Sequence, residues 1–513
     1  MARARITLDP DFTIGPVPRR LFGSFVEHMG RCVYTGIYEP GHPEADGRGL
    51  RRDVLELTKE LGVSVVRYPG GNFVSGYNWE DGIGPVEHRP RRLDGAWHTL
   101  ETNEFGLHEF IDWARLADVE VMEAVNLGTR GVEDARALVE YANHPSGTQR
   151  ADLRRSNGAE DPFDIRLWCL GNEMDGPWQI GYKTADEYGR LAAETARAMR
   201  MVDSRLELVA CGSSNLSMPT FGAWEETVLG HTYALVDYIS LHVYYSDRDG
   251  DVESFLASAV DMDRFIEGVV ATADAVRARG HHEKYIDLSF DEWNVAYRRD
   301  QTEKPTEAEI TRNWDEHPPI GEGDFDVTEA VVVGTMLNSL LRHGDRVKIA
   351  NQAQLVNLLG LIRTEEGGPA WRQTIFFPFA AMANTAKGQI LRAAVKSDRS
   401  TSARYGDADV VDVAATWDDQ NGSVSLFLAN RGLTESADVS VALRGLRADG
   451  IGSARVLTVP DGADRFAANT AHEQPVGLVD LDGARIEDGS LALTLPALCW
   501  AVITVDVSAE YRR

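Results

Sequence analysis

Residues 164–173 read DIRLWCLGNE, a short apolar run that ends in a single carboxylate. Its length and composition are typical of a strand buried on both faces, as in a parallel sheet covered by helices. The same pattern of an apolar run with a polar tip recurs in RRLFGSFVEH at 19–28, VSVVRYPGGN at 63–72, VEVMEAVNLG at 119–128, LELVACGSS at 206–214, DYISLHVY at 237–244, YIDLSFDEWN at 285–294 and RVKIANQAQ at 346–354.

Helix-like stretches separate these runs, among them 102–118, in which apolar residues recur at helical spacing. Eight strand–helix units in series predict a fold of the α/β class, a parallel (β/α)8 or TIM barrel. The active site of such a barrel lies at the carboxyl ends of its strands. We therefore expect one rim to carry the polar tips of the eight runs, which are Glu27, Asn72, Asn126, Glu173, Ser213, His242, Glu292 and Gln354.

The residue pattern of the chain changes after about residue 387, where short runs of β-forming residues are separated by Gly, Asp and Asn. This pattern predicts a C-terminal antiparallel β-sandwich, jelly-roll-like in form. We assign 17–386 to the catalytic barrel and 1–16 plus 387–513 to the sandwich, because the extended N-terminal segment needs a partner. The long irregular stretch 298–325 follows the seventh run; it is either a lid or subsite wall carrying Trp314 or a solvated insertion.

Composition excludes several classes of protein. The net charge of −28 argues against nucleic acid and anionic membranes as partners, and it favours a neutral ligand. The four cysteines match no metal or disulfide pattern, and no glycine-rich phosphate loop is present, so we expect no metal and no cofactor. The first residues, MARARITLDPDFTIG, lack the apolar core of a signal peptide, and no run reaches membrane-spanning length, which predicts a cytoplasmic protein.

Glu173 and Glu292 are the strongest candidates for catalysis. They lie 292 − 173 = 119 residues apart, so only the tertiary fold can bring them together. A carboxylate that ends an apolar strand is costly to bury unless it has a partner or a task. Two carboxylates facing each other suit glycoside hydrolysis, in which one protonates the leaving oxygen and the other attacks the sugar carbon and later leaves.

A larger set of motifs resembles one family of glycosidases across the whole barrel. The motifs are FGSFVEHMGRCVYTGIYEP at 22–40, VRYPGGNFVSGYNWEDGIGP at 66–85, WCLGNEMDGPWQIG at 168–181, LHVYY at 241–245, DEWNVAY at 291–297 and ANQAQLVN at 350–357. Together they resemble the α-L-arabinofuranosidases of glycoside hydrolase family 51, whose architecture also includes a trailing β-sandwich. The resemblance further implies a homo-oligomer, frequently a hexamer.

The resemblance implies a role for each candidate residue. Glu173 is expected to be the general acid/base and Glu292 the nucleophile. The residues expected to hydrogen-bond the furanose hydroxyls are Glu27, Asn72, Asn172 and Gln354. Tyr244 is expected to contact the nucleophile or the sugar, His242 to lie near both carboxylates, and Arg67 to keep Glu292 ionised, since a guanidinium favours a charged carboxylate. We expect the charge of Glu292 to raise the pKa of Glu173.

Several of these residues also have plainer interpretations. His242 has the alternative interpretation of a core histidine satisfied by the backbone, Glu27 that of a structural partner of Arg31, and Asn72 that of a turn residue. Asp291 is expected to point away from its neighbour Glu292, since adjacent strand residues alternate. Finally, Trp97 and Trp178 lie in loops after the second and fourth runs, and they are either sugar platforms or packing residues.

The function that these observations favour is an exo-acting, retaining α-L-arabinofuranosidase that acts on arabino-oligosaccharides or on fragments of arabinan and arabinoxylan. Another retaining glycosidase on the same scaffold, such as an endo-glucanase or a β-xylosidase, is the nearest alternative. A carbohydrate-binding protein without catalysis is a more distant one, disfavoured because both Glu173 and Glu292 are present.

Overall fold

The computed structural model describes residues 1–247, 250–296 and 314–509. Within these residues the predicted runs form a closed parallel barrel in which each strand pairs with the next along the chain, and the last pairs with the first. The barrel strands are β3 (Gly23–Phe25), β4 (Val65–Tyr68), β7 (Glu120–Val125), β8 (Leu167–Leu170), β9 (Glu207–Ala210), β10 (Tyr238–Tyr245), β11 (Asp287–Val295) and β12 (Val347–Gln352). The predicted barrel is therefore confirmed.

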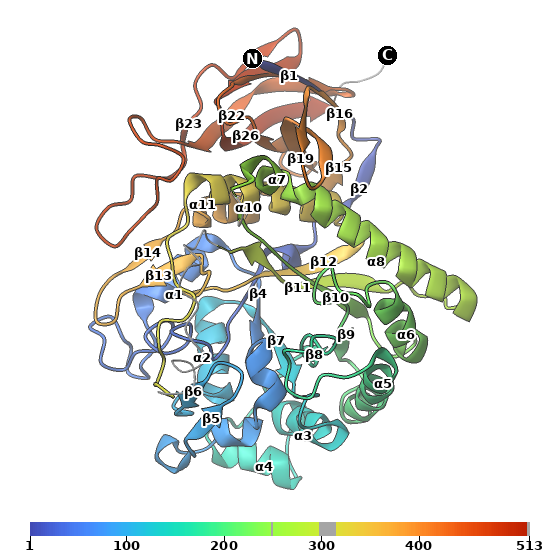
Figure 1. Cartoon of the computed structure of the whole chain (residues 1–513), viewed down its shortest axis with the longest axis vertical. Helices are drawn as coiled ribbons and strands as arrows, with labels where there is room; N and C mark the ends of the chain where they lie inside the picture. Colours follow the sequence, from blue (N-terminus) through green and yellow to red (C-terminus); the bar gives the residue numbers. More distant parts are fainter. Residues whose placement is uncertain (248–249, 297–313, 510–513) are drawn as a thin grey trace.

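Helices surround the barrel, as Figure 1 shows. They are α1 (Arg52–Leu61), α2 (Leu107–Ala117), α3 (Val132–Asn143), α4 (Gln149–Ser156), α5 (Ala185–Val202), α6 (Ala223–Thr232), α7 (Val252–Leu256), α8 (Ser258–Gly280), α10 (Val327–Arg342) and α11 (Phe376–Thr385). The main apolar core lies between these helices and the strands, while a small cluster that includes Met122, Leu167 and Ile349 fills the barrel interior. The interior is thus packed, which leaves the carboxyl rim as the place for chemistry.

Two sheets form the C-terminal sandwich, and a second apolar core lies between them. One sheet has the order β16 (Ala394–Ser397), β1 (Ala2–Leu8), β21 (Ala437–Leu443), β25 (Ser490–Leu495) and β24 (Arg485–Glu487). The other has the order β2 (Thr13–Pro16), β15 (Gln389–Leu391), β19 (Val411–Asp418), β20 (Ser423–Asn430), β26 (Cys499–Ala509), β22 (Leu446–Thr458) and β23 (Val479–Asp480).

The N-terminal segment joins these sheets, as the sequence predicted for an extended segment without a barrel partner. Strand β2 pairs with β15, and β1 pairs antiparallel with β16. The pairing of β1 with β21 is parallel, which is an exception in an otherwise antiparallel sandwich. These pairings agree with the division into 17–386 and 1–16 plus 387–513, which stays a prediction.

The sandwich packs against the barrel through helix α10, which lies beneath it in Figure 1. Gly334 of α10 allows this close approach, because a Cβ atom there would lie 2.2 Å from the ring of Trp500. Asp412 of the sandwich accepts hydrogen bonds from Asn338 at 2.7 Å and from Arg342 at 3.0 Å. The two parts therefore share both apolar and charged contacts.

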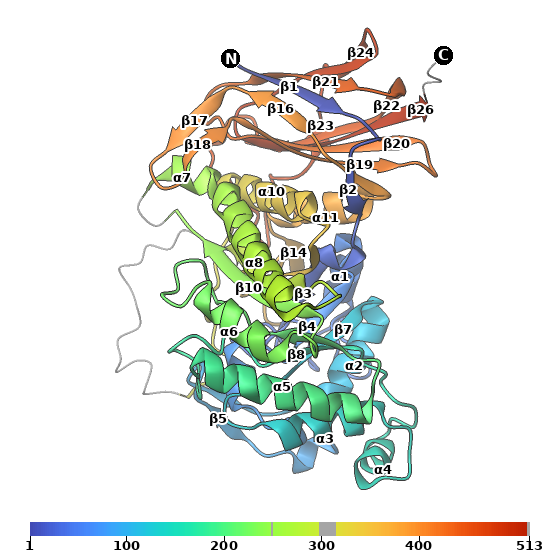
Figure 2. The same cartoon turned by 90° about the vertical axis from the view of Figure 1, so that its right-hand side faces the viewer.

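Three short two-stranded sheets complete the fold: β5 (Arg92–Asp94) with β6 (Thr99–Glu101), β13 (Ile362–Thr364) with β14 (Ala370–Arg372), and β17 (Arg399–Ser402) with β18 (Gly406–Asp409). The β17–β18 hairpin of the sandwich reaches down beside α7 at the top of the barrel (Figure 2). This hairpin brings residues from the sandwich to the barrel rim.

Other sequence expectations concern single features. All four cysteines are buried free thiols. A capping box formed by Thr184 and Glu187 begins α5. Residues 298–313 of the predicted lid lie outside the described residues, whereas the ring of Trp314 lies next to that of His98, with 5.3 Å between their centroids. Across the described parts of the chain, no helix has both the length and the apolar character needed to cross a bilayer.

Candidate active site

Glu173 follows strand β8 in a tight turn. Gly171 has a φ of +92° and Glu173 a φ of +44°, so the chain passes twice through the left-handed region within three residues. Such backbone is uncommon for a residue with a side chain and occurs preferentially at functional sites. The turn places the carboxylate at the rim, where its Oε2 accepts a hydrogen bond of 2.6 Å from Nε1 of Trp178.

Glu292 lies within strand β11 and is almost fully buried. Its Oε1 accepts a hydrogen bond of 2.8 Å from Nη1 of Arg67, and its Oε2 accepts one of 2.8 Å from the hydroxyl of Tyr244. Each oxygen therefore has a strong donor, and one of these donors carries a full positive charge. The two donors hold both oxygens of the carboxylate in place.

The sequence-based expectation for Asp291 was wrong. Asp291 does not point away from the barrel, because its Oδ2 contacts the thiol of Cys169 at 3.6 Å, and Cys169 belongs to the interior cluster. The reason is a register shift in β11 between Phe290 and Trp293, which breaks the alternation of side chains. A bulge of this kind re-aims side chains next to active sites, and here it turns Glu292 inward as well.

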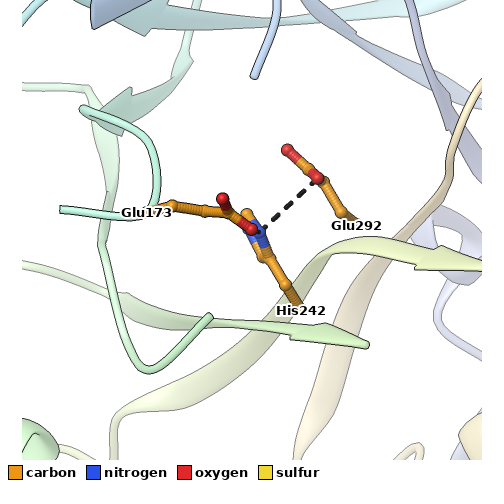
Figure 3. A group of neighbouring side chains, drawn as sticks. All are labelled: Glu173, His242 and Glu292. Atoms are coloured by element: carbon orange, nitrogen blue, oxygen red, sulfur yellow. Dashed lines mark hydrogen bonds and ion pairs between the residues drawn. The ribbon is translucent and has the colours of Figure 1, made fainter. Parts of the chain in front are cut away.

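His242 connects the two carboxylates. Its Nδ1 lies 3.0 Å from Oε1 of Glu173 and 3.6 Å from Oε2 of Glu292, as Figure 3 shows. Burial alone would lower the pKa of His242, but the charge of Glu292 and the hydrogen bond with Glu173 raise it above its ordinary value. The alternative of a core histidine satisfied by the backbone is therefore wrong, and the imidazole belongs to the site.

The predicted direction of the pKa of Glu173 was also wrong. Burial raises that pKa, but the hydrogen bond and charge of His242, together with the donor Trp178, lower it below its ordinary value. The sequence argument considered only the repulsion between Glu173 and Glu292, whereas the structure places a protonatable imidazole between them. The pair of Glu173 and His242 thus shares one proton, which rests on the imidazole.

Arg67 links the two halves of the site. Besides Glu292, it donates from Nη2 to Oδ1 of Asn172 at 2.6 Å, and Asn172 in turn donates to Oδ1 of Asn72 at 3.4 Å. The same Asn72 oxygen accepts a short hydrogen bond from Gln179. Sequence reasoning missed Gln179, although it stands in the motif at 168–181 next to Trp178, and that proximity was the available signal.

Glu27 is buried close to Glu292. Its Oε1 accepts hydrogen bonds from the backbone N–H of Phe73 at 2.9 Å and from Nε1 of Trp97 at 3.0 Å, and its Oε2 accepts one from Gln354 at 3.1 Å. Burial and then the charge of Glu292 raise the pKa of Glu27 to about 8. The alternative pairing with Arg31 is wrong, since that guanidinium binds Glu322 instead.

A glycine makes room for the two buried carboxylates. A Cβ atom at Gly71 would lie 2.9 Å from Oε1 of Glu292 and 3.2 Å from Oε2 of Glu27. The backbone at Gly71 therefore forms part of the wall of the site, and any side chain there would displace one of the carboxylates.

Two tryptophans flank the site from loops. Asp94 of the β5–β6 hairpin accepts hydrogen bonds from the backbone N–H groups of Ala96 at 3.0 Å and Trp97 at 3.1 Å, which fixes the loop that holds Trp97 over Glu27. Trp178 keeps 50% of its surface exposed while bonding Glu173. An exposed ring with one polar contact has a free face, which a sugar can cover.

Of the eight predicted rim residues, two take no part in this cluster. Asn126 hydrogen-bonds the backbone N–H groups of Gly128 and Thr129 and shapes the loop after β7. Ser213 lies at the end of β9, where its backbone N–H donates to Glu225. The remaining six belong to the connected network around the carboxylates.

The arrangement defines a class of enzyme. One oxygen of Glu173, one oxygen of Glu292 and a ring nitrogen of His242 all lie within 4.8 Å of one another, which is close enough to hold a metal ion. It is also the close spacing of retaining glycosidases, whose carboxyl groups stand about 5–5.5 Å apart, whereas inverting enzymes need about 6.5–9.5 Å to admit a water. Fold and site together are those of a retaining glycoside hydrolase.

Comparison with known proteins shows which family of glycoside hydrolases the chain resembles. Residues 57–263 match the α-L-arabinofuranosidase 1 domain, and residues 291–499 match the α-L-arabinofuranosidase C-terminal domain. An intracellular exo-α-(1→5)-L-arabinofuranosidase of Streptomyces lividans is 56% identical over 98% of this chain and 75% of its own length. A protein of that name from Bacillus subtilis is 49% identical over 98% of this chain and 99% of its own length.

A solved structure supports the same family assignment. A family 51 α-L-arabinofuranosidase from Bifidobacterium longum is 46% identical, covers 98% of this chain and 100% of its own, and superposes with a TM-score of 0.92. This chain therefore belongs to the α-L-arabinofuranosidases of glycoside hydrolase family 51. The resemblance inferred from the barrel motifs is confirmed.

Proposed function

We propose that this chain releases terminal, non-reducing α-L-arabinofuranosyl residues with retention of configuration, with Glu173 as general acid/base and Glu292 as nucleophile. The observation that carries the proposal is the approach of the two carboxylates to within 4.8 Å at the carboxyl rim of the barrel. That spacing suits direct attack by one carboxylate while the other protonates the leaving oxygen.

In the first step, Glu292 attacks the anomeric carbon. Arg67 and Tyr244 hold its two oxygens in place until it forms the bond. At the same time Glu173 gives a proton to the leaving oxygen. His242 supplies that proton to Glu173 across their 3.0 Å hydrogen bond. The transfer is favoured because bound substrate displaces water from the site, and without water the separate charges of imidazolium and carboxylate are disfavoured.

In the second step, the covalent glycosyl-enzyme no longer carries the charge of Glu292. His242 gave up its proton in the first step and stays neutral, because the charge of Glu292 that favours the imidazolium is gone, and Glu173 is left as an anion beside it. Glu173 then takes a proton from water, whose oxygen attacks the anomeric carbon and displaces Glu292. Two successive inversions at one carbon give overall retention.

The sugar is held by the network on the other side of the nucleophile. Glu27, Asn72, Asn172 and Gln354 are placed by β3, β4, β8 and β12 around the same cleft and offer donors and acceptors to the furanose hydroxyls. Trp97 and Trp178 border this cleft and provide ring faces for the sugar. No cofactor is required in this scheme.

Substrate and location follow from the relatives. Several are named exo-α-(1→5)-L-arabinofuranosidases, and one from Bifidobacterium longum, 47% identical, is named an exo-α-(1→6)-L-arabinofuranosidase. We infer arabino-oligosaccharides as substrates and an intracellular location, as in the names of those relatives. The homo-oligomer implied by the family resemblance stays a prediction, which light scattering of the purified protein checks.

The alternative of an endo-glucanase or β-xylosidase is not favoured, because curated relatives at 46–56% identity over the full chain are arabinofuranosidases. The test is hydrolysis of p-nitrophenyl α-L-arabinofuranoside, β-D-xyloside and β-D-glucoside, with the first-formed anomer followed by proton NMR. We expect turnover of the arabinofuranoside and initial release of the α-anomer. Initial release of the β-anomer, or turnover of the other glycosides alone, would contradict the proposal.

A further inference from the structure

A cavity of about 690 Å³ opens beside the acid/base residue. Its lining includes Glu173 and Trp178, residues at the end of β10, and Arg404 and Tyr405. The last two belong to the turn between β17 and β18, so part of the wall of the cavity comes from the sandwich and not from the barrel. Its volume lies within the range of about 300–1,000 Å³ that is typical of small-molecule sites.

The lining of the cavity shows which part of a substrate it serves. Of the two catalytic carboxylates, only Glu173 is among its lining residues, and Glu27, Asn72 and Gln354 are not. An acid that protonates the leaving oxygen stands on the leaving-group side of the scissile bond. The cavity therefore extends from the point where the leaving group begins, away from the furanose that is cleaved off.

The turn that closes the cavity is fixed in place by the barrel helices. The backbone N–H of Arg404 donates to Oγ of Ser254 in α7 at 3.1 Å, and the carbonyl of Tyr405 accepts from Arg264 in α8 at 3.0 Å. The ring of Tyr405 also meets the ring of Tyr245 edge-on, with 6.5 Å between centroids. A wall held by such contacts is formed before a ligand arrives, which lowers the cost of binding.

The chemistry of the lining suits a neutral sugar chain. Besides Tyr405, the cavity presents the rings of Tyr244 and Trp178, which are 39% and 50% exposed. Asp261 and Arg404 stand among these rings and offer an acceptor and donors to hydroxyl groups. Aromatic faces combined with a few polar groups are the usual composition of a site for an uncharged, hydroxyl-rich ligand.

We propose that the β17–β18 turn forms a distal leaving-group subsite, in which Tyr405 packs on a sugar ring beyond the one next to the scissile bond and Arg404 binds its hydroxyls. The sandwich thereby takes part in choosing the chain length of the substrate. This inference rests on the function proposed above, because it assumes that an arabinofuranosyl bond is broken at Glu173.

The test compares kcat/KM for p-nitrophenyl α-L-arabinofuranoside, which has no distal sugar, with kcat/KM for α-1,5-linked arabinotriose. Tyr405→Ala is expected to lower the value for arabinotriose about 3- to 10-fold while leaving the aryl substrate unchanged, in keeping with the loss of one ring contact. Tyr405→Phe keeps the ring and is expected to behave like the wild type. Arg404→Ala is expected to show the same selective loss, which covers the case in which Tyr405→Ala does not fold.

Thr401→Ala is the matched control, because Thr401 lies in the same hairpin, its hydroxyl bonds Asp407, and it is not among the lining residues of the cavity. The inference is overturned if neither Tyr405→Ala nor Arg404→Ala changes the ratio of the two kcat/KM values, or if both substrates lose activity in parallel. Failure of the proposed function looks different, since the wild type would then be inactive on the aryl arabinofuranoside itself.

Discussion

Nδ1 of His242 lies 3.0 Å from Oε1 of Glu173, at the point where strand β10 reaches the barrel rim. The pKa of the imidazole is raised and that of the carboxyl is lowered, so in the free enzyme their shared proton rests on the imidazole. The acid proposed above is therefore a pair of residues, and its proton is lost only when the pH rises above the raised pKa of His242.

Replacement of His242 by asparagine tests this pairing. His242→Asn keeps a hydrogen-bond donor near the position of Nδ1 but removes the titratable proton. We expect kcat/KM for an arabino-oligosaccharide to fall about 10²-fold, because general acid catalysis contributes a rate factor of that order. The loss should be smaller for the p-nitrophenyl substrate, because its leaving group needs little protonation. The alkaline limb of the kcat/KM profile should move to lower pH.

The control for this variant is His231→Gln, which alters another histidine–carboxylate pair, 2.8 Å from Asp186 on the outside of the barrel. It should leave both substrates and the pH profile unchanged. An alkaline limb that stays in place in His242→Asn would show that the imidazole does not hold the catalytic proton.

Arg67 offers a second test, because its two terminal nitrogens serve different partners, Glu292 and Asn172. Arg67→Lys keeps the charge but provides a single nitrogen, so one of the two hydrogen bonds is lost. We expect kcat/KM to fall about 10- to 100-fold, the effect of losing a hydrogen bond to a charged group of about 1.5–3 kcal/mol. Steady-state kinetics on the aryl arabinofuranoside measures it.

Arg154 is the matched control, since it is equally buried and donates only to backbone carbonyls, including that of Tyr141 at 2.9 Å, outside the active site. Arg154→Lys should lower the melting temperature and leave kcat/KM unchanged. If the two variants lose activity to the same degree, the hydrogen bonds of Arg67 to Glu292 and Asn172 do not explain the loss of kcat/KM.

Glu27 predicts a dependence of stability on pH. Its pKa rises from 4.5 to about 8 on folding, so between these values the folded state binds a proton that the unfolded state has released. Stability therefore falls as the pH rises through this window, by at most about 1.4 kcal/mol per pH unit. Glu27→Gln cannot ionise, and its free energy of unfolding should fall less steeply.

Chemical denaturation of both proteins at about pH 5.5, 6.5 and 7.5, which all lie within this window, measures the difference. His242, whose raised pKa also makes stability fall as the pH rises, is present in both proteins and cancels in the comparison. Glu133→Gln is the control, because that exposed carboxyl has a lowered pKa and is ionised throughout the window. Parallel curves for wild type and Glu27→Gln would refute the assignment.

Much of the fold was predictable from the sequence because the barrel strands are buried on both faces. DIRLWCLGNE and its counterparts are apolar for that reason, and each marks a strand of the closed barrel. The polar tips were visible as well, since a parallel barrel collects the ends of its strands at one rim. Position along the strand thus sufficed to propose Glu173 and Glu292 as the catalytic pair, and the structure brings them together at the rim.

The features that the sequence did not reveal depend on strand register, on distances between side chains and on the docking of the sandwich. The register shift in β11 turns Asp291 inward, and nothing in the residues DEWN marks a bulge. The lowered pKa of Glu173 depends on an imidazole 3.0 Å away, a distance set by tertiary packing. Tyr405 reaches the rim only because the β17–β18 turn of the sandwich packs on α7 and α8. No local sequence pattern predicts that packing.

The most direct test of the central claim is the rescue of Glu173→Ala and Glu292→Ala by azide, with the p-nitrophenyl arabinofuranoside as substrate. If Glu292 is the nucleophile, azide replaces water in the second step of Glu173→Ala and yields the α-configured arabinofuranosyl azide. In Glu292→Ala it replaces the missing carboxylate and yields the β-configured azide. The reverse pattern of products would contradict the assignment of the two carboxylates.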